Sequence, residues 1–234
     1  WVMWTAGVSG FKTEWRNHKV SFGASETEPK ALLRITLEGK GAIDLDMISL
    51  FPADTWKGRE NGLRKDLVRM IADLKPGFLR FPGGCIVEGR TIENRYQWKT
   101  TVGPVEDRKL IMNRWNLEIR NRQAPDYFQS FGLGFYEYFL LAEDIGAEPL
   151  PIVNCGMSCQ YNAAEVVPLE ELDIYIQDAR DLIEFANGET STRWGGLRAE
   201  MGHPEKFNLK YIGVGNEQWD VQYIERYREF EKVL

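Results

Sequence analysis

The sequence predicts an α/β protein, with a partial (β/α)8 TIM barrel that follows an N-terminal antiparallel β-sandwich segment. From residue 59 onward, amphipathic helical patterns alternate with short apolar strands, which is typical of parallel strands joined by right-handed crossovers. Residues 1 to about 50 show instead the two-residue alternation of half-buried strands. We therefore assign residues 1–58 to the sandwich segment and residues 59–234 to an incomplete barrel.

In the N-terminal segment, two strand patterns flank one turn. Leu33–Leu37 and Ile43–Met47 alternate apolar and polar residues, and the stretch Glu38–Gly41 between them contains two glycines. Half-buried strands joined by such a turn indicate one flank of an antiparallel sandwich. For this segment a spacer role and a carbohydrate-binding role are both open.

Three helices with an apolar face are predicted in the second segment. They cover, in order, residues 63–74, 135–145 and 172–186, and each ends at a stretch that contains glycine. A strand follows each helix, at residues 78–81, 148–154 and 210–215. Between residues 83 and 131 the sequence predicts a long loop.

Two arrangements of such a sheet are possible, an open doubly wound sheet and a β/α barrel. Phe81–Cys85 follows a strand and contains two glycines, but it lacks the G-x-G-x-x-G and GK[ST] patterns of phosphate-binding loops. The loop predicted after it provides no helix N-terminus for a phosphate. These features disfavour a nucleotide-binding Rossmann domain and favour a barrel, with long loops at the carboxyl ends of its strands.

Composition disfavours several classes of partner. The net charge of −6 argues against nucleic acid, and no apolar stretch reaches the roughly 20 residues of a membrane span. With three cysteines and two histidines, the sequence predicts no metal site and no cofactor, and we expect Cys85 and Cys155 to be free thiols. The 8 Trp, 9 Tyr and 12 Phe suit the faces of sugars, although most of these rings are expected in the core.

Polar residues follow all three predicted strands. Arg80 and Cys85 lie at the end of the first strand, Asn154 at the end of the second, and Asn216 and Glu217 at the end of the third. Because the carboxyl ends of parallel barrel strands meet at one mouth, we expect these side chains to cluster there. A single polar strand end means little, but three that converge indicate a functional site.

Several motifs resemble glycoside hydrolase family 51, whose best-known members are α-L-arabinofuranosidases. They are LRFPGGCIVEG (residues 79–89), TVGP with EDR (101–108), GLGFYEYF (132–139) and GNEQWD (215–220). Residues 46–76 also resemble the run that leads into the barrel in members with an inserted sandwich module. The resemblance covers about residues 45–220, and it implies that the chain holds the end of that module and the first half of the catalytic barrel.

The resemblance implies a retaining glycosidase that removes terminal α-L-arabinofuranosyl residues from arabinoxylan or arabinan. Glu217 would be the general acid/base, and partial burial is expected to raise its pKa so that it holds a proton near neutral pH. Asn216 would donate a hydrogen bond to the sugar 2-hydroxyl. The nucleophile of the family is a Glu near the end of the seventh strand, so we expect it outside this chain and assign none.

Four further residues are candidates for substrate binding by the same resemblance. Arg80 corresponds to an arginine of the sugar pocket, with the bracing of carboxylates as the alternative. Cys85 stands where some members carry an asparagine that touches sugar. Trp98 and Trp115 lie in the long loop and either stack on a sugar or pack within the loop. His203 precedes the third predicted strand at its opposite end and is assigned a structural role.

Two other interpretations stay open. An endo-acting glucanase or xylanase would use the same barrel and the same pair of carboxyl groups, and activity on an aryl arabinofuranoside against a β-glucan separates the two enzymes. A non-catalytic carbohydrate-binding piece is the other, with Glu217 only closing a polar network. The expected partner is an oligosaccharide or polysaccharide substrate. We expect a secreted or periplasmic protein and leave its oligomeric state open.

Overall fold

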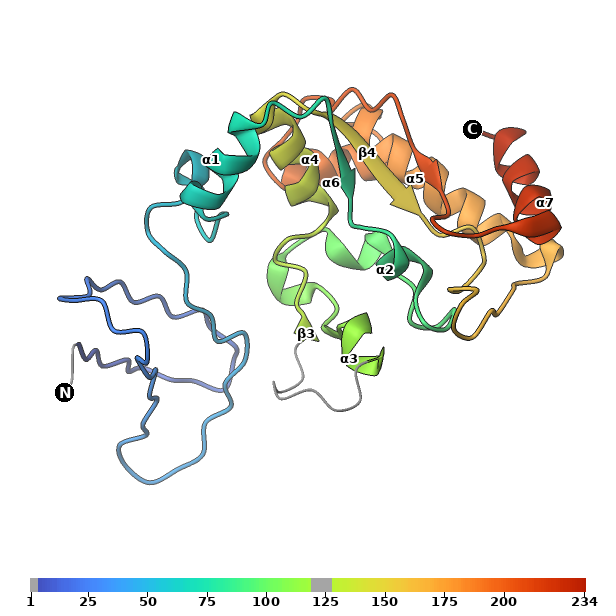
Figure 1. Ribbon diagram of the computed structural model, residues 1–234. Coiled ribbons are helices and arrows are strands. Elements are labelled where there is room, and N and C mark those ends of the chain that lie inside the picture. Colours follow the sequence, from blue (N-terminus) through green and yellow to red (C-terminus); the bar gives the residue numbers. More distant parts are fainter. Residues whose placement is uncertain (1–3, 119–127) are drawn as a thin grey trace. The chain divides into compact units, whose positions relative to one another are not determined.

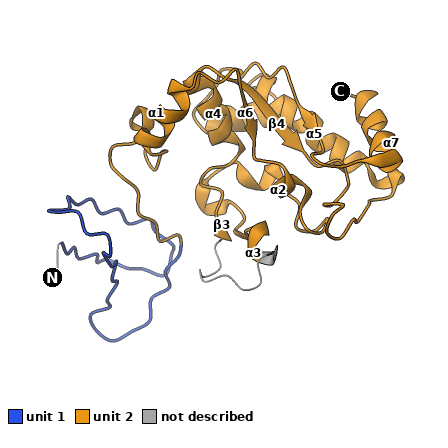
Figure 2. Ribbon diagram, in the orientation of Figure 1, with its two compact units in different colours: residues 1–46 blue, residues 47–234 orange. Residues whose placement is uncertain are grey.

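A parallel sheet of three strands, β1 (Phe78–Phe81), β4 (Glu148–Val153) and β5 (Gly213–Val214), frames the larger part of the chain (Figure 1). The computed structural model describes residues 4–118 and 128–234. It contains two units, residues 1–46 and residues 47–234 (Figure 2). All three strands lie where the sequence predicts them and run parallel, which confirms the predicted succession of β/α units.

The central strand β4 pairs with a different neighbour along each half of its length. Phe78 to Phe81 of β1 lie opposite Glu148 to Pro151. On the other side, Ile152 lies opposite Gly213, and Val153 lies opposite Val214. β5 is therefore shorter than the strand predicted over residues 210–215.

Two prolines explain why β5 is short. The carbonyl of Val153 accepts a hydrogen bond from the backbone N–H of Gly215 at 2.8 Å, so Val153 directs its backbone groups toward β5. Backbone groups alternate sides along a strand, so Pro149 and Pro151 face β5 as well. Because proline has no N–H to donate, the ladder between β4 and β5 forms only beyond Pro151.

The predicted helices are present as α1 (Lys65–Asp73), α4 (Phe135–Ile145) and α5 (Asp173–Asn187). α4 ends at Gly146, whose φ of 70° is the left-handed conformation that closes many helices. α4 and α5 pack against β4 (Figure 1). α1 differs, because only Val68 on it is buried, and the apolar side chains of Leu67, Met70, Ile71 and Leu74 are exposed.

An aromatic cluster joins β1 to α4. Phe81 is buried, and its ring stacks on Tyr138 with centroids 5.0 Å apart. Phe135 and Phe139 meet the same ring edge-on, at 5.2 and 5.1 Å. Offset and edge-to-face pairs are the favoured geometries of aromatic rings, so this cluster fixes the point at which β1 ends.

Helix α6 (Arg193–Glu200) is absent from the sequence-based prediction. Thr192 caps it by accepting a hydrogen bond from the backbone N–H of Gly195 at 3.2 Å. Its buried Arg198 donates to the carbonyls of Phe185, Gly188, His203 and Pro204, at 2.7 to 3.0 Å. Arg198 thereby ties the end of α5 to the segment that leads to β5.

The predicted loop over residues 83–131 holds short elements instead. They are α2 (Cys85–Glu88), η2 (Trp98–Thr101), η3 (Val105–Asp107), α3 (Arg114–Glu118) and the antiparallel pair β2 (Ile111–Met112) and β3 (Phe128–Gln129). Each has two to five residues, which is too short for apolar periodicity to reveal. The remaining elements are η1 (Trp56–Gly58), η4 (Leu169–Glu171) and α7 (Asp220–Glu231). In the described part of the chain, no helix has the length and apolar character to cross a membrane.

The predicted β-sandwich segment is not confirmed. Residues 4–46 contain no strand or helix, and the side chains of Leu33, Ile35 and Leu37 are exposed. Alternation makes a segment fit for a strand, but a ladder also needs a partner strand and an apolar face to cover. Within this unit, Trp4 stacks on Phe22 with ring centroids 4.5 Å apart.

Replacement of Arg198 by Met should destabilise the larger unit. Four buried or partly buried carbonyls lose their donor, so the free energy of unfolding should fall by about 2–4 kcal/mol. Arg193→Met is the matched control on the same helix, because Arg193 is exposed and only covers the ring of Trp194. Urea unfolding followed by circular dichroism measures both variants, and equal losses would contradict this role for Arg198.

Candidate active site

The carboxyl ends of β1 and β5 bring Arg80, Asn216 and Glu217 together, as the sequence predicts. Arg80 Nη2 donates to Oδ1 of Asn216 at 2.5 Å. On the other side, Cys85 Sγ donates to Oε2 of Glu217 at 3.2 Å. Four of the six predicted site residues therefore form one hydrogen-bonded cluster. Arg80 holds the amide of Asn216, and neither contact with a sugar nor the bracing of a carboxylate is tested by this bond.

A fifth residue, Glu88, joins this cluster and was not predicted. One oxygen of its carboxyl group, Oε1, accepts from Nδ2 of Asn216 at 3.0 Å and from the backbone N–H of Glu217 at 2.9 Å. Glu88 is 1% exposed. It follows Cys85 by three residues in α2, so both side chains lie on the same side of one helical turn. This spacing would have indicated that Glu88 lies beside Cys85 only if the segment had been predicted to be helical.

Two glycines allow α2 to approach the end of β5. Gly83 has a φ of 145°, a conformation that other residues rarely adopt. A Cβ atom on Gly84 would lie 2.6 Å from Oδ1 of Asn216. Any larger residue at position 84 would thus displace the side chain that Arg80 and Glu88 hold.

Asn154, at the end of β4, supports the backbone of α2 and makes no hydrogen bond to the residues of the cluster that lie at the end of β5. Its buried side chain donates to the carbonyls of Val87 and Met157, at 3.0 and 3.1 Å, and accepts from the backbone N–H of Gly156 at 2.7 Å. The amide thus fixes α2 to the central strand. The sequence marked this strand end correctly, but the residue acts on backbone groups.

The loop after β5 is held by two glutamines. Gln218 accepts from the backbone N–H of Asn216 at 2.6 Å. Gln160 accepts from the backbone N–H of Trp219 at 2.6 Å and donates to its carbonyl at 3.3 Å. The backbone on either side of Glu217 is therefore fixed, while its side chain is exposed. The predicted partial burial of Glu217 is wrong for this chain, in which the residue is exposed and Cys85 of α2 contacts the carboxyl group.

The two tryptophans predicted to bind sugar differ in their surroundings. Trp98 is 2% exposed, its Nε1 donates to the carbonyl of Asp178 at 2.9 Å, and its ring packs on Trp194 with centroids 4.9 Å apart. It is a core residue, so the packing alternative holds. Trp115 is exposed, and the guanidinium of Arg114 lies 5.4 Å from its ring centroid. Of these two tryptophans, Trp115 is the one that offers an exposed ring to a ligand.

His203 makes the structural contacts expected of it. Its ring stacks on Phe207 with centroids 4.2 Å apart, and its Nδ1 lies 2.8 Å from the carbonyl oxygen of Glu205. Its Nε2 lies 3.2 Å from the carboxylate of Glu143 on α4. These contacts join the segment before β5 to α4.

Cys85, Cys155 and Cys159 are free thiols. Burial raises the pKa of the Cys85 thiol to about 11, and the hydrogen bond to Glu217 and the charge of Glu88 act in the same direction. Cys85 is therefore protonated near neutral pH and acts as a donor to Glu217. Burial also raises the pKa of Cys155 to about 12.

Cys85, Glu88 and Glu217 are the residues of the described chain that could together hold a metal ion. One potential ligand atom from each lies within 4.8 Å of the others. The hydrogen bonds of Cys85 and Glu88 to Glu217 already account for this closeness. The geometry therefore gives no independent support to a metal centre.

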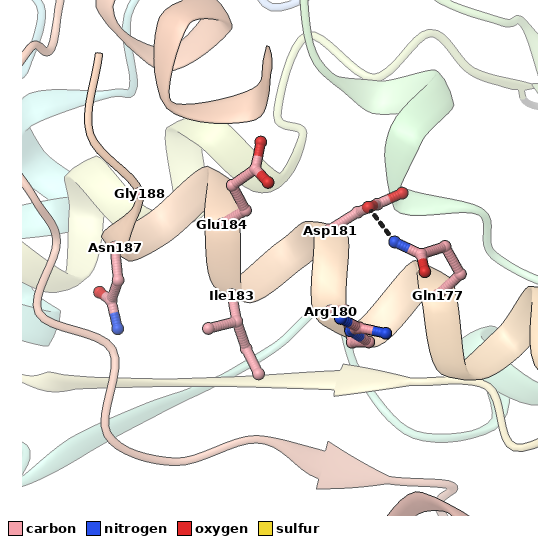
Figure 3. A pocket seen from close by; sticks show the side chains of 7 residues that line it. All are labelled: Gln177, Arg180, Asp181, Ile183, Glu184, Asn187 and Gly188. Carbon is pink, nitrogen blue, oxygen red and sulfur yellow. Dashed lines mark hydrogen bonds between the residues drawn. The ribbon is translucent and has the colours of Figure 1, made fainter. Parts of the chain in front are cut away.

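A second candidate site is a pocket along α5 (Figure 3). Its lining residues are Gln177, Arg180, Asp181, Ile183, Glu184, Asn187 and Gly188. Several of its polar groups hold neighbouring elements: Asp181 pairs with Lys99, Glu184 accepts from the backbone N–H of Trp194, and Asn187 pairs with Leu209. None of the predicted site residues lines this pocket, so it does not compete with the cluster as a reaction site.

Comparison with known protein sequences finds relatives over most of the chain. Residues 70–234 match the family described as "Alpha-L-arabinofuranosidase 1 domain". The chain is 43% identical over 233 residues to an extracellular exo-α-L-arabinofuranosidase of Streptomyces chartreusis, a match that covers 94% of this chain and 27% of that protein. It is 42% identical over 208 residues to α-L-arabinofuranosidase 1 of Arabidopsis thaliana, covering 88% of this chain and 28% of that protein.

Solved structures are similar as well. An arabinose-bound GH51 α-L-arabinofuranosidase matches with a TM-score of 0.65 and 37% identity, over 76% of this chain and 27% of that chain. An α-L-arabinofuranosidase from Thermotoga maritima in complex with arabinose matches with a TM-score of 0.53 and 26% identity, over 73% of this chain and 31% of that chain. The chain thus spans less than a third of the length of these relatives.

The raised pKa of Cys85 predicts slow alkylation. Since only the thiolate reacts, iodoacetamide at pH 8 should modify Cys85 on the order of a hundredfold more slowly than an unperturbed cysteine. The rate should rise as the pH approaches 11. The protonated thiol favours the folded state, and this contribution is lost as the pH rises from the ordinary value of 9.0 through about 11.

Peptide mass spectrometry measures the alkylation of each cysteine separately. Glu217→Gln provides the matched comparison, because loss of the neighbouring carboxylate should lower the pKa of Cys85 and speed its alkylation. Alkylation of Cys85 at pH 8 as fast as that of an unperturbed cysteine, with no response to Glu217→Gln, would contradict the assignment.

Proposed function

Because this chain belongs to the α-L-arabinofuranosidase 1 domain family, we propose that it is part of a retaining glycoside hydrolase that removes terminal α-L-arabinofuranosyl residues. The substrates are arabinose-containing plant polysaccharides such as arabinoxylan and arabinan. The observation that carries the proposal is the pair Asn216–Glu217, held at the end of β5 within the matched residues 70–234. The name of the Streptomyces chartreusis relative supports exo action and a secreted protein.

Glu217 is the general acid/base in this proposal. A retaining glycosidase needs one carboxyl group that protonates the leaving oxygen and later takes a proton from water, roughly 5 Å from a carboxylate that attacks the sugar. Glu217 suits the first role, because its backbone is fixed by Glu88 while its side chain is exposed. The thiol of Cys85 donates to Oε2 and leaves Oε1 to face a ligand.

Glu88 does not suit the role of the nucleophile, despite its closeness to Glu217. It is 1% exposed, and one of its oxygens already accepts two hydrogen bonds. A sugar could not reach it without displacing Asn216. We therefore place the nucleophile outside this chain, as the family resemblance implies.

The remaining candidate residues have unequal roles in substrate binding. Asn216 keeps one N–H of its amide for the sugar 2-hydroxyl, since Nδ2 donates once within the cluster, to Glu88. Arg80 acts on the sugar through Asn216. Trp115 offers an exposed ring for a leaving sugar.

We also assign residues 59–234 to the first half of a (β/α)8 barrel. Exposed apolar side chains on the helices before and after the sheet strands support this assignment. Leu67 and Met70 lie on α1, which precedes β1 in the chain, and Val221 and Ile224 lie on α7, which follows β5. Further barrel strands would cover both sets.

Replacement of Glu217 by Gln in the full-length protein that carries this chain tests the proposal. The variant keeps the shape of the side chain and loses the proton donor, so kcat on poor leaving groups should fall by about 10²–10⁴-fold. Activated aryl α-L-arabinofuranosides need little protonation and should lose less in the first step. Their glycosyl-enzyme should accumulate, and azide should speed its turnover.

Glu165→Gln is the control, because exposed Glu165 also accepts a backbone N–H, from Ile92 at 2.7 Å, and lies outside the cluster. Similar losses on both substrate types for Glu217→Gln, without azide rescue, would make Glu217 a structural carboxylate. Hydrolysis of a β-glucan in place of the arabinofuranoside by the unmodified protein would favour the endo-acting alternative.

A further inference from the structure

We propose that Glu88 is a positioning residue that holds the general acid/base and the neighbouring amide in their reactive arrangement. This inference rests on the proposed function, in which Glu217 supplies the proton. Glu88 itself touches no substrate, because it is buried beneath Asn216 and Glu217. It acts through these two residues.

The first support is that a single oxygen of Glu88 binds both functional residues. Oε1 accepts from the side chain of Asn216 and from the backbone N–H of Glu217, at 3.0 and 2.9 Å. The two donors belong to consecutive residues, so the bonds fix the peptide between them as well as the amide. Hydrogen bonds to a charged acceptor are about twice as strong as neutral ones. A backbone rotation that turns the Asn216–Glu217 peptide away from Glu88 breaks at least one of them, and the carboxyl group of Glu217 is held separately by Cys85.

The second support is that Glu88 is itself firmly held. Asn154 donates to the carbonyls of Val87 and Glu88, at 3.0 and 3.4 Å, which fixes α2 to the end of β4. The carbonyl of Gly89, the residue that follows α2, accepts from the backbone N–H of Cys159 at 3.1 Å, which adds a second anchor at the same end of the helix. The position of Glu88 is thus set by the central strand, and it transmits that position to Glu217.

The third support is the cost of keeping a carboxyl group at this place. The second oxygen of Glu88, Oε2, is buried and makes no hydrogen bond to any residue that the structure describes. A buried polar atom without a partner destabilises the fold, so a residue chosen for stability alone would be less polar. A carboxyl group here is explained by the two donors that it holds.

The consequence for catalysis concerns the position of the Glu217 carboxyl group relative to the leaving oxygen. An acid/base that is displaced by about 1 Å loses on the order of a hundredfold in rate, because proton transfer needs hydrogen-bond geometry. Loss of Glu88 should therefore reduce protonation of the leaving oxygen more than it reduces binding of the sugar. The reduction should depend on the leaving group in the same way as loss of Glu217 does.

Three variants of the full-length protein test this inference. Glu88→Ala removes the oxygen that accepts both hydrogen bonds, and kcat on an arabinoside with a poor leaving group should fall by about 10–100-fold, with a several-fold smaller loss on an activated aryl arabinofuranoside. Glu88→Gln keeps one acceptor oxygen and should retain most of the activity, so it serves as the conservative rescue. Glu165→Gln controls for loss of a carboxylate that accepts a backbone N–H elsewhere. Thermal unfolding shows which variants keep the fold.

A double-mutant comparison separates positioning from general damage. If Glu88 acts through Glu217, adding Glu88→Ala to Glu217→Gln should change kcat on the poor substrate by less than about threefold, since groups that act as a unit are not additive. Full additivity would overturn the inference, as would an equal loss by Glu88→Ala on both substrates. If Glu217→Gln alone shows no dependence on the leaving group, the proposed function fails first, and that result is distinct from a failure of Glu88.

Discussion

Hydrogen bonding along β4 decides where the site forms. β1 pairs with the first half of β4. Over the same stretch Pro149 and Pro151 have no N–H to donate to β5. β5 is therefore held at the far end, by Ile152 and Val153, immediately before Asn216 and Glu217 leave the sheet. Asn154, the residue that follows β4, fixes α2. Consecutive residues at the end of one strand thus position both halves of the cluster.

The site itself is a chain of donors and acceptors. Arg80 donates to Asn216, Asn216 and the backbone of Glu217 donate to Glu88, and Cys85 donates to Glu217. The two glycines before α2 make the approach possible, because a side chain at Gly84 would occupy the place of the Asn216 amide. Each catalytic or binding atom is therefore oriented by a neighbour whose own position depends on the sheet.

The sequence was sufficient for the elements that are long and periodic. α4 and α5 bury one apolar face, and the strands before the site are short apolar runs, so both follow from residue spacing. The sequence did not predict α6, because Gly195 and Gly196 lower its helix propensity and its most buried side chain is the charged Arg198. The strands expected before residue 47 did not form, because alternation alone supplies no partner strand.

For the site, the sequence indicated which strand ends meet but not what lies between them. Arg80, Asn216 and Glu217 follow from the convergence of parallel strands. Glu88 could not be found in this way, because it reaches the cluster from a four-residue helix that has no pattern of its own. Trp98 was ambiguous for a related reason, since an indole suits a sugar face and a core equally well. Only the packing against Trp194 decides between them.

The side chain of Asn187 replaces the missing start of the β4–β5 ladder. Its amide donates to the carbonyl of Leu209 at 2.9 Å and accepts the N–H of the same residue at 2.8 Å, much as a neighbouring peptide would. The segment that leads into β5 is therefore attached to the last turn of α5 rather than to the sheet. Local unfolding of that turn frees Leu209 together with Asn187, whereas fraying where β1 meets the start of β4 leaves both in place. Protection of the Leu209 amide against hydrogen exchange thus follows the stability of the helix end.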